Sequence, residues 1–180
     1  MTLPAMTHGN NQVASYERPF RLPLGNTKCC CYQEVISNGP AGPNGSVVET
    51  CWWFVPQLNV IRPDGTVEWK IAPPTCVGGM CVNICAEGLC DIPFYVFPPE
   101  SGTTKEEKVG YITKILGGSI NTIDATKFEV EFPPAATPDS KARLLGALFL
   151  INQIFFERSG GVLPKSPLVL LPYGVSKEVT

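Results

Sequence analysis

A helix predicted within residues 137–156 is so apolar that its whole surface must be covered by protein or lipid. Thr137, Pro138 and Asp139 supply a helix N-cap, a proline at the first helical position and an acid in the first turn. Residues 142–156 follow with Gly146 as their helix breaker, and residues 144–151 are apolar all the way round. Such a helix is either surrounded by protein or inserted in lipid.

The length of the apolar run favours protein over lipid. A transmembrane helix needs about 20 apolar residues. Here the run from Leu144 to Ile151 is followed by Asn152 and Gln153, which carry side-chain amides. We therefore expect a buried core helix, with membrane insertion as the alternative. The residues expected to face the core or a membrane are Leu144, Leu145, Leu148, Phe149, Ile151, Phe155 and Phe156.

The rest of the chain is typical of short β-strands separated by turns. A hairpin is predicted around residues 62–65, where Pro63 and Gly65 suit a type I turn. Residues 38–46 (NGPAGPNGS) indicate a loop. Strands are predicted at residues 30–37, 47–55, 58–61, 66–71, 80–85, 92–97, 109–116 and 127–132. Residues 47–55 include the aromatic run Trp52-Trp53-Phe54. The fold class is thus mainly β with one hydrophobic helix.

Composition excludes several functions. Charged residues make up 17% of the chain and the net charge is -2, against about 25% charged in ordinary domains. A nearly neutral chain does not bind nucleic acid by bulk charge. His8 is the sole histidine, so histidine-based triads are excluded from the folded part, and no phosphate-binding glycine motif is present. We expect no enzyme, and a charge-poor surface that contacts a membrane, a partner or a missing part of the fold.

The cysteines form two groups. Cys29, Cys30 and Cys31 are consecutive, which is typical of S-acylated segments. No secretory signal is visible at the N-terminus, so we expect an intracellular protein with reduced thiols. The second group is Cys76, Cys81, Cys85 and Cys90. A strand over 81–85 would hold its two cysteines about 13 Å apart, so buried thiols are favoured over a zinc site.

Several motifs together resemble the phospholipid scramblase family. The strongest are residues 124–134 (DATKFEVEFPP) and 141–160 (KARLLGALFLINQIFFERSG), which are similar to the family's C-terminal signature. The upstream motifs in the same order are 16–21 (YERPFR), 29–31 (CCC), 33–35 (QEV), 72–76 (APPTC) and 109–114 (VGYITK).

The resemblance implies a tubby-like β-barrel wrapped around a C-terminal central helix, with the apolar segments 47–55 and 76–97 inside the barrel. Family barrels have several strands before the Glu-Arg-Pro segment, where this chain has about a dozen residues, so it implies an incomplete barrel with unpaired edges. The expected division is a flexible lead at residues 1–12, a partial scramblase domain at 13–160 and a tail at 161–180.

The resemblance also implies a function. The implied function is the ATP-independent movement of phospholipids between membrane leaflets. The resemblance also implies that acyl chains on Cys29, Cys30 and Cys31 tether the protein to the cytoplasmic face of the plasma membrane. The alternative is a lipid-anchored, tubby-like binding or regulatory module without transport. The implied partners are a phospholipid membrane and a protein that completes the barrel. The segment matching the family's nuclear-targeting region keeps only Lys114 as a basic residue, so no nucleic-acid role is expected.

A calcium loop is the last implied feature. The family loop starts at the position of Asp124, which makes Asp124 and Thr126 candidate ligands. Lys127 and Glu129 then depart from the pattern, and Ala135 ends the loop without a carboxylate. Because Ca²⁺ requires six to eight oxygen ligands, we expect binding here to be weak at most.

Overall fold

The computed structural model describes residues 2–8, 11–21, 31–74, 92–115 and 127–156. In these residues nine antiparallel strands form one sheet, and each strand pairs with its neighbour along the chain. The strands are β1 (Thr2–His8), β2 (Asn11–Glu17), β3 (Glu34–Gly39), β4 (Gly42–Glu49), β5 (Leu58–Ile61), β6 (Val67–Ala72), β7 (Pro93–Phe97), β8 (Gly110–Ile115) and β9 (Lys127–Glu131). The helices are η1 (Lys105–Glu107), α2 (Pro138–Ile151) and the π-helical turn η2 (Asn152–Phe156).

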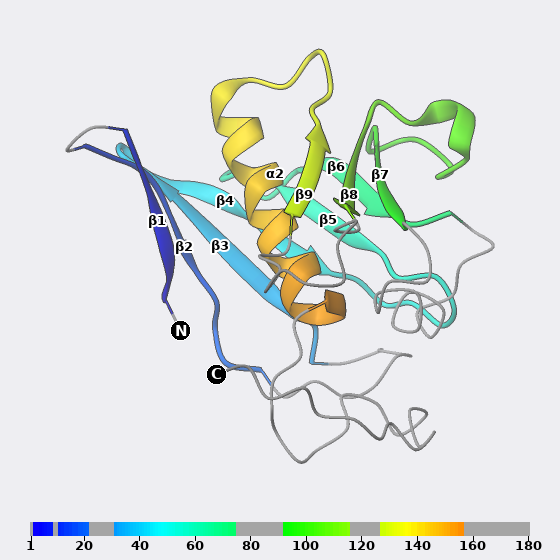
Figure 1. Cartoon of the computed structure of the whole chain (residues 1–180), viewed down its shortest axis with the longest axis horizontal. Helices are drawn as coiled ribbons and strands as arrows, with labels where there is room; N and C mark the ends of the chain where they lie inside the picture. Colours follow the sequence, from blue (N-terminus) through cyan, green and yellow to red (C-terminus); the bar gives the residue numbers. More distant parts are fainter. Residues whose placement is uncertain (1, 9–10, 22–30, 75–91, 116–126, 157–180) are drawn as a thin grey trace, which may run out of the picture.

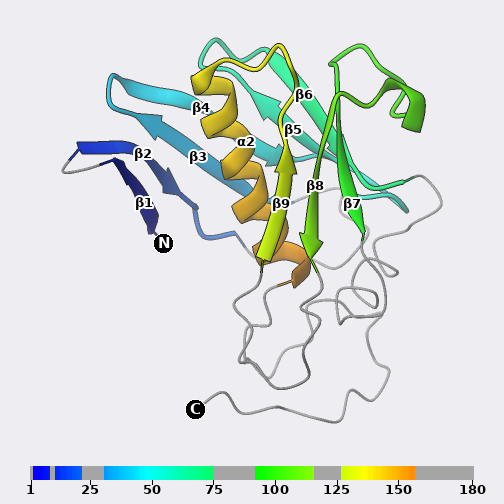
Figure 2. The same ribbon diagram turned by 45° about the horizontal axis from the view of Figure 1, so that its top comes forward.

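The sheet curls around α2 (Figures 1 and 2). Aromatic contacts join the helical segment to strands on both sides, with ring centroids 5.1 Å apart for Tyr16 and Phe149 and 5.7 Å for Phe128 and Phe156. Within the described residues β1 and β9 are the two edges of the sheet and do not pair with each other. The predicted fold class is confirmed: a mainly β chain with one C-terminal helix, arranged as a half-barrel consistent with an incomplete barrel.

The helix begins where the sequence predicts. Thr137 Oγ1 accepts a hydrogen bond from the Ser140 backbone N–H at 3.2 Å, and Pro138 occupies the first turn. Trp69 Nε1 donates to Ser140 Oγ at 2.8 Å, which attaches this end of the helix to β6. In the part of the chain that the structure describes, no helix has both the length and the apolar character needed to cross a membrane.

The core lies between the concave face of the sheet and α2. The helix residues expected to face core or membrane are all at least half-buried. Leu144, Ile151 and Phe155 are buried, whereas Leu145, Leu148, Phe149 and Phe156 are half-buried and pack against the same cluster. They meet buried residues of the strands, among them Val35, Val47, Val60, Ile71 and Ile112. The apolar helix is therefore covered by its own sheet along much of its surface.

Gly146, the helix breaker noted in the sequence, allows this close packing. A Cβ atom at Gly146 would lie 3.3 Å from Tyr16 Cε1 and 3.7 Å from Val35 Cγ1. The missing side chain lets the Tyr16 ring rest against the helix, and Tyr16 Oη donates to the Ala142 carbonyl at 2.9 Å. The residue that weakens the helix by propensity thus brings β2 and β3 into contact with it.

Two local predictions are wrong, and a strand was not foreseen. Residues 38–46 are not a loop, because β3 continues to Gly39 and β4 begins at Gly42. The glycines that indicated a loop permit a tight antiparallel pairing, since a Cβ at Gly45 (φ +109°) would lie 2.2 Å from the Ile61 carbonyl oxygen. In addition, β1 covers Thr2–His8, within the segment expected to be a flexible lead.

The second wrong prediction concerns the aromatic segment 52–54. β4 ends at Glu49, and only Trp52 of the three aromatic residues is buried. The side chains of Trp53 and Phe54 are 75% and 61% exposed. They therefore lie outside the barrel interior in which the resemblance placed them.

Candidate functional site

A buried glutamine joins the two chain segments that flank residues 22–30. Gln33 Nε2 donates to the carbonyl oxygens of Arg21 and Cys31, both at 3.2 Å. Gln33 Oε1 accepts from Arg18 Nη2 at 2.7 Å. Arg21 also forms an ion pair with Glu34. The end of β2 and the start of β3 are thus fixed to each other around one amide side chain.

A buried carboxylate extends this network to β4. Glu49 Oε2 accepts from the Gln33 backbone N–H at 3.2 Å, and the Glu49 N–H donates to the Gln33 carbonyl at 2.8 Å. Glu49 Oε1 accepts from Trp52 Nε1 at 3.1 Å. We call these contacts the Gln33–Glu49 hub. It holds three segments at one end of the sheet: residues 18–21, residues 31–33 and the connection after β4.

Exposed apolar and thiol side chains surround this hub. Phe20 is 88% exposed and comes directly before Arg21, while Trp53 and Phe54 follow the anchored Trp52. Cys31 and Cys51 are both exposed. Buried polar contacts therefore hold in place a sheet end that presents three large aromatic side chains and two cysteines to the outside.

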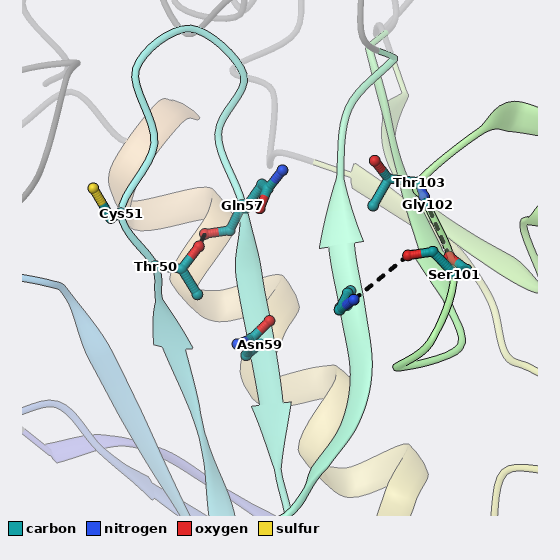
Figure 3. A pocket seen from close by; sticks show the side chains of 8 residues that line it. Thr50, Cys51, Gln57, Asn59, Ser101, Gly102 and Thr103 are labelled. Carbon is teal, nitrogen blue, oxygen red and sulfur yellow. Dashed lines mark hydrogen bonds between the residues drawn. The ribbon is translucent and has the colours of Figure 1, made fainter.

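An open cleft lies where the connection between β4 and β5 meets the two strands (Figure 3). Asn59 and Lys70 are cross-strand partners on β5 and β6, and their neighbours Leu58, Val60 and Ile71 are buried in the core. Because side chains alternate along a strand, the cleft lies on the sheet face turned away from α2. Its volume is about 460 Å³, and its lining residues are Thr50, Cys51, Gln57, Asn59, Lys70, Ser101, Gly102 and Thr103.

The predicted site residues are only partly described by the structure. Of the acylation candidates, Cys31 is exposed with φ 56°, whereas Cys29 and Cys30 lie outside the described residues. The same holds for the calcium candidates Asp124 and Thr126, and for Cys76, Cys81, Cys85 and Cys90. Within the described ranges, no group of three or more His, Cys, Asp or Glu could hold a metal ion.

Sequence reasoning missed the exposed aromatic residues and the cleft. Strand propensity places Trp53 and Phe54 in a strand, because aromatic residues favour strands. The contrary signal was Pro56 two residues later, together with the lack of alternation through Trp52-Trp53-Phe54. The cleft could not be found in this way, because it joins residues from three separate segments.

Comparison with known proteins supports the family resemblance that the sequence motifs indicate. The family model described as Scramblase matches residues 2–158. The chain is 30% identical to phospholipid scramblase 1 of Rattus norvegicus over 165 residues, which cover 88% of this chain and 44% of the relative. It is 29% identical to phospholipid scramblase 2 of Bos taurus over 166 residues, with 89% and 51% covered. For phospholipid scramblase family member 5 of Homo sapiens, the identity is 29% over 164 residues, with 88% and 55% covered.

The chain spans about half the length of these curated relatives. No solved structure matches it significantly. The family match nevertheless covers β1 to β9 and the whole of α2. The resemblance seen in the sequence is confirmed, and the chain belongs to the scramblase family.

Proposed function

We propose that this protein is a phospholipid scramblase-like protein that moves phospholipids between membrane leaflets without ATP. Two observations support the proposal. The family match extends over residues 2–158, and Cys31 is exposed at the same sheet end as Phe20, Trp53 and Phe54. We infer lipid transport rather than chemical catalysis.

The tether is formed by acyl chains on Cys29, Cys30 and Cys31. One acyl chain gives marginal membrane binding, whereas two or more give stable attachment. The Gln33 side chain bonds to the Cys31 carbonyl and thereby connects this segment to the folded sheet. With the cysteines acylated, the hub end of the protein would face the cytoplasmic leaflet of the plasma membrane.

The tether is tested by replacing Cys29, Cys30 and Cys31 together with serine and fractionating cells that express the variant. The protein is expected to move from the membrane fraction to the cytosol. Cys90→Ser is the matched control, because it removes a thiol that lies outside the consecutive run 29–31, and it should leave the partitioning unchanged. Unchanged partitioning of the triple variant would rule out the tether.

Transport itself needs a separate test. The acylated full chain is reconstituted into vesicles with a fluorescent phospholipid, and the fluorescence accessible to a membrane-impermeant reductant is followed without ATP. Transport predicts that the reductant removes more than the outer-leaflet signal. A loss equal to that of protein-free vesicles would exclude transport by this chain.

The alternative function is a lipid-anchored, tubby-like binding or regulatory module without transport. The packing of α2 favours it, because Leu144, Ala147 and Leu150 are at most 1% exposed within the half-barrel. The edge strands β1 and β9 would then accept strands of a protein partner that completes the barrel. Deletion of residues 138–158 should unfold the domain if α2 is a core helix. A folded but detached deletion variant would instead support a membrane helix.

Calcium has at most a minor part in this proposal. Lys127 stands inside the expected ligand set that begins at Asp124, and a cation there opposes Ca²⁺ binding. Calorimetric titration should show no binding tighter than about 10⁻³ M, the weak end of modular sites. A micromolar signal would contradict this expectation.

A further inference from the structure

We propose that the cleft beside Lys70 binds the phosphate-bearing headgroup of an anionic phospholipid while Trp53 and Phe54 enter the interfacial layer of the same bilayer. This inference deepens the proposed function, since it rests on the phospholipid membrane as partner. It does not depend on acylation or on transport. It assigns a contact surface for the membrane on the folded part of the chain.

The cleft offers one positive charge among neutral hydrogen-bonding groups. Its lining residues include Lys70 and no carboxylate. Within the described residues, Lys70 Nζ donates one long hydrogen bond, 3.4 Å, to the Ser101 carbonyl (dashed in Figure 3). An ammonium group carries three N–H donors, so two remain for oxygens of a bound anion. The amides of Gln57 and Asn59 and the hydroxyl of Thr103 add neutral groups around it.

One carboxylate lies beside the cleft but is not among its lining residues. The Glu107 carboxylate reaches the same turn from outside the lining set, where its Oε2 accepts the Gly102 N–H at 3.0 Å. Thr50 Oγ1 donates to the Gln57 carbonyl at 3.3 Å, which joins the two arms of the connection between β4 and β5. The volume of about 460 Å³ lies within the usual range for small-molecule sites.

Trp53 and Phe54 lie at the tip of the connection between β4 and β5, the same connection that lines part of the cleft. Trp52 is buried and bonded to Glu49, so the chain is anchored immediately before Trp53 and Phe54. Figure 3 shows Thr50 and Cys51 on one arm and Gln57 on the other, with the loop between them extending beyond the strands. Two adjacent aromatic side chains exposed to water forgo the free energy that burial against an apolar phase would provide.

The combination of these features favours a lipid surface over a soluble anion or a protein. A soluble phosphate would use the cleft and leave Trp53 and Phe54 in water. Tryptophan is enriched at the level of lipid headgroups, where an apolar ring and a polar N–H are both satisfied. A bilayer supplies phosphate for Lys70 and an apolar boundary for the loop tip at the same time. The exposed Phe20 at the hub end extends the same apolar character.

The first test measures vesicle binding by the unacylated full chain. Flotation is compared between vesicles of phosphatidylcholine alone and vesicles that also contain phosphatidylserine. Lys70→Gln should lower the affinity for phosphatidylserine vesicles by about tenfold, as expected for loss of a charge-assisted hydrogen bond. The matched control is Lys105→Gln on η1, an exposed lysine outside the cleft, which should change the affinity less than twofold, since bulk charge alone acts weakly. Equal losses in both variants would mean bulk charge attraction and would overturn the headgroup site.

The second test locates the loop tip by fluorescence quenching. Lipids brominated near the glycerol end of the acyl chains should quench the wild-type tryptophan emission. Trp53→Phe keeps an apolar ring but removes the reporter, so the quenching should disappear. The emission of Trp52 and Trp69 remains as an internal reference, because one is buried and the other half-buried. Quenching that persists in Trp53→Phe would overturn insertion of this loop.

The third test distinguishes a lipid headgroup from free phosphate. The rate of maleimide labelling at Cys51, a lining residue, is followed by peptide mass spectrometry. Phosphatidylserine vesicles should slow the labelling severalfold, and millimolar inorganic phosphate should not. Protection by inorganic phosphate alone would overturn the membrane assignment.

None of these measurements uses acylation or lipid transfer. Loss of the Lys70 and Trp53 effects with an intact cysteine tether would therefore refute this site alone. Intact vesicle binding without transport would refute only the transport part of the proposed function.

Discussion

The guanidinium group of Arg143 and the carboxylate of Glu68 form a buried ion pair that joins α2 to β6. Arg143 Nε and Nη2 lie 2.9 and 2.8 Å from Glu68 Oε2, and the two residues are 4% and 7% exposed. Arg143 Nη1 also donates to the backbone and side-chain oxygens of Asn44 on β4. This charged residue, which directly precedes the apolar residues 144–151, thus fixes the helix against two strands.

Removing the arginine should destabilise the fold strongly. Arg143→Met leaves the Glu68 carboxylate buried, with Arg62 Nε at 3.4 Å from its other oxygen. We expect a loss of about 3–5 kcal/mol in the free energy of unfolding, measured by urea denaturation. The double variant Arg143→Met/Glu68→Met should lose less, because no buried charge is left alone.

Lys141→Met is the control for this pair. Lys141 is exposed on the same helix and lies 5.6 Å from the centre of the Phe132 ring. Its replacement should cost at most about 1 kcal/mol. A similar cost for Arg143→Met would show that the ion pair does not hold the helix in place.

Alanine substitutions at Gly42 and Gly45 distinguish the energetic cost of backbone strain from that of steric overlap. Both have positive φ, but a Cβ at Gly45 would lie 2.2 Å from the Ile61 carbonyl oxygen, whereas at Gly42 nothing lies within 4 Å. Gly42→Ala should cost about 1–2 kcal/mol from backbone strain alone. Gly45→Ala should cost about 1–3 kcal/mol more because β4 and β5 must separate. Equal unfolding free energies of the two variants would contradict this packing.

Tyr16 should make the stability depend on alkaline pH. Burial raises the pKa of Tyr16 to about 12, above its value near 10 in the unfolded chain. The neutral phenol therefore contributes stability that is fully present below about pH 10 and is lost as the pH rises towards 12.

Tyr16→Phe isolates this contribution. The variant should lose about 1 kcal/mol at neutral pH, because the hydrogen bond to the Ala142 carbonyl is gone. It should also show a smaller decrease in stability between pH 10 and 12, measured by denaturant unfolding at each pH. An identical alkaline decrease in both proteins would assign the effect to other groups.

The Gln33–Glu49 hub should control the order of the candidate membrane-contact end. Glu49→Ala removes the acceptor of both the Gln33 N–H and Trp52 Nε1. We expect a loss of about 1–3 kcal/mol and faster amide hydrogen exchange at Gln33 and residues 50–57. Glu106→Ala, at an exposed acid on η1, should leave that exchange unchanged. If both variants exchange alike, the hub does not order this end.

The elements set by local chemistry could be predicted from the sequence. Alternation over 127–132 predicted β9, the turn at residues 62–65 predicted the hairpin of β5 and β6, and Thr137 marked the start of α2. Each of these signals lies within a few neighbouring residues. The pattern of short strands with one apolar helix was therefore sufficient for the fold class.

The remaining features depend on partners that are distant in the sequence. Arg143 and Glu68 are 75 residues apart, and nothing near Arg143 indicates its partner. Gly45 resembles a loop residue until the Ile61 carbonyl is placed against it. The exposure of Trp53 depends on the bond that turns Trp52 towards Glu49, so strand propensity alone gave the wrong position.

The strand order also determines when the concave surface becomes covered. Because each strand pairs with the one synthesised just before it, the sheet can grow during translation by closing short loops. The helix that covers the concave face follows all nine described strands. Until it emerges from the ribosome, Val35, Val60 and Ile71 have no helix against them, so the nascent chain is most aggregation-prone after β9 has been synthesised and before α2 can pack.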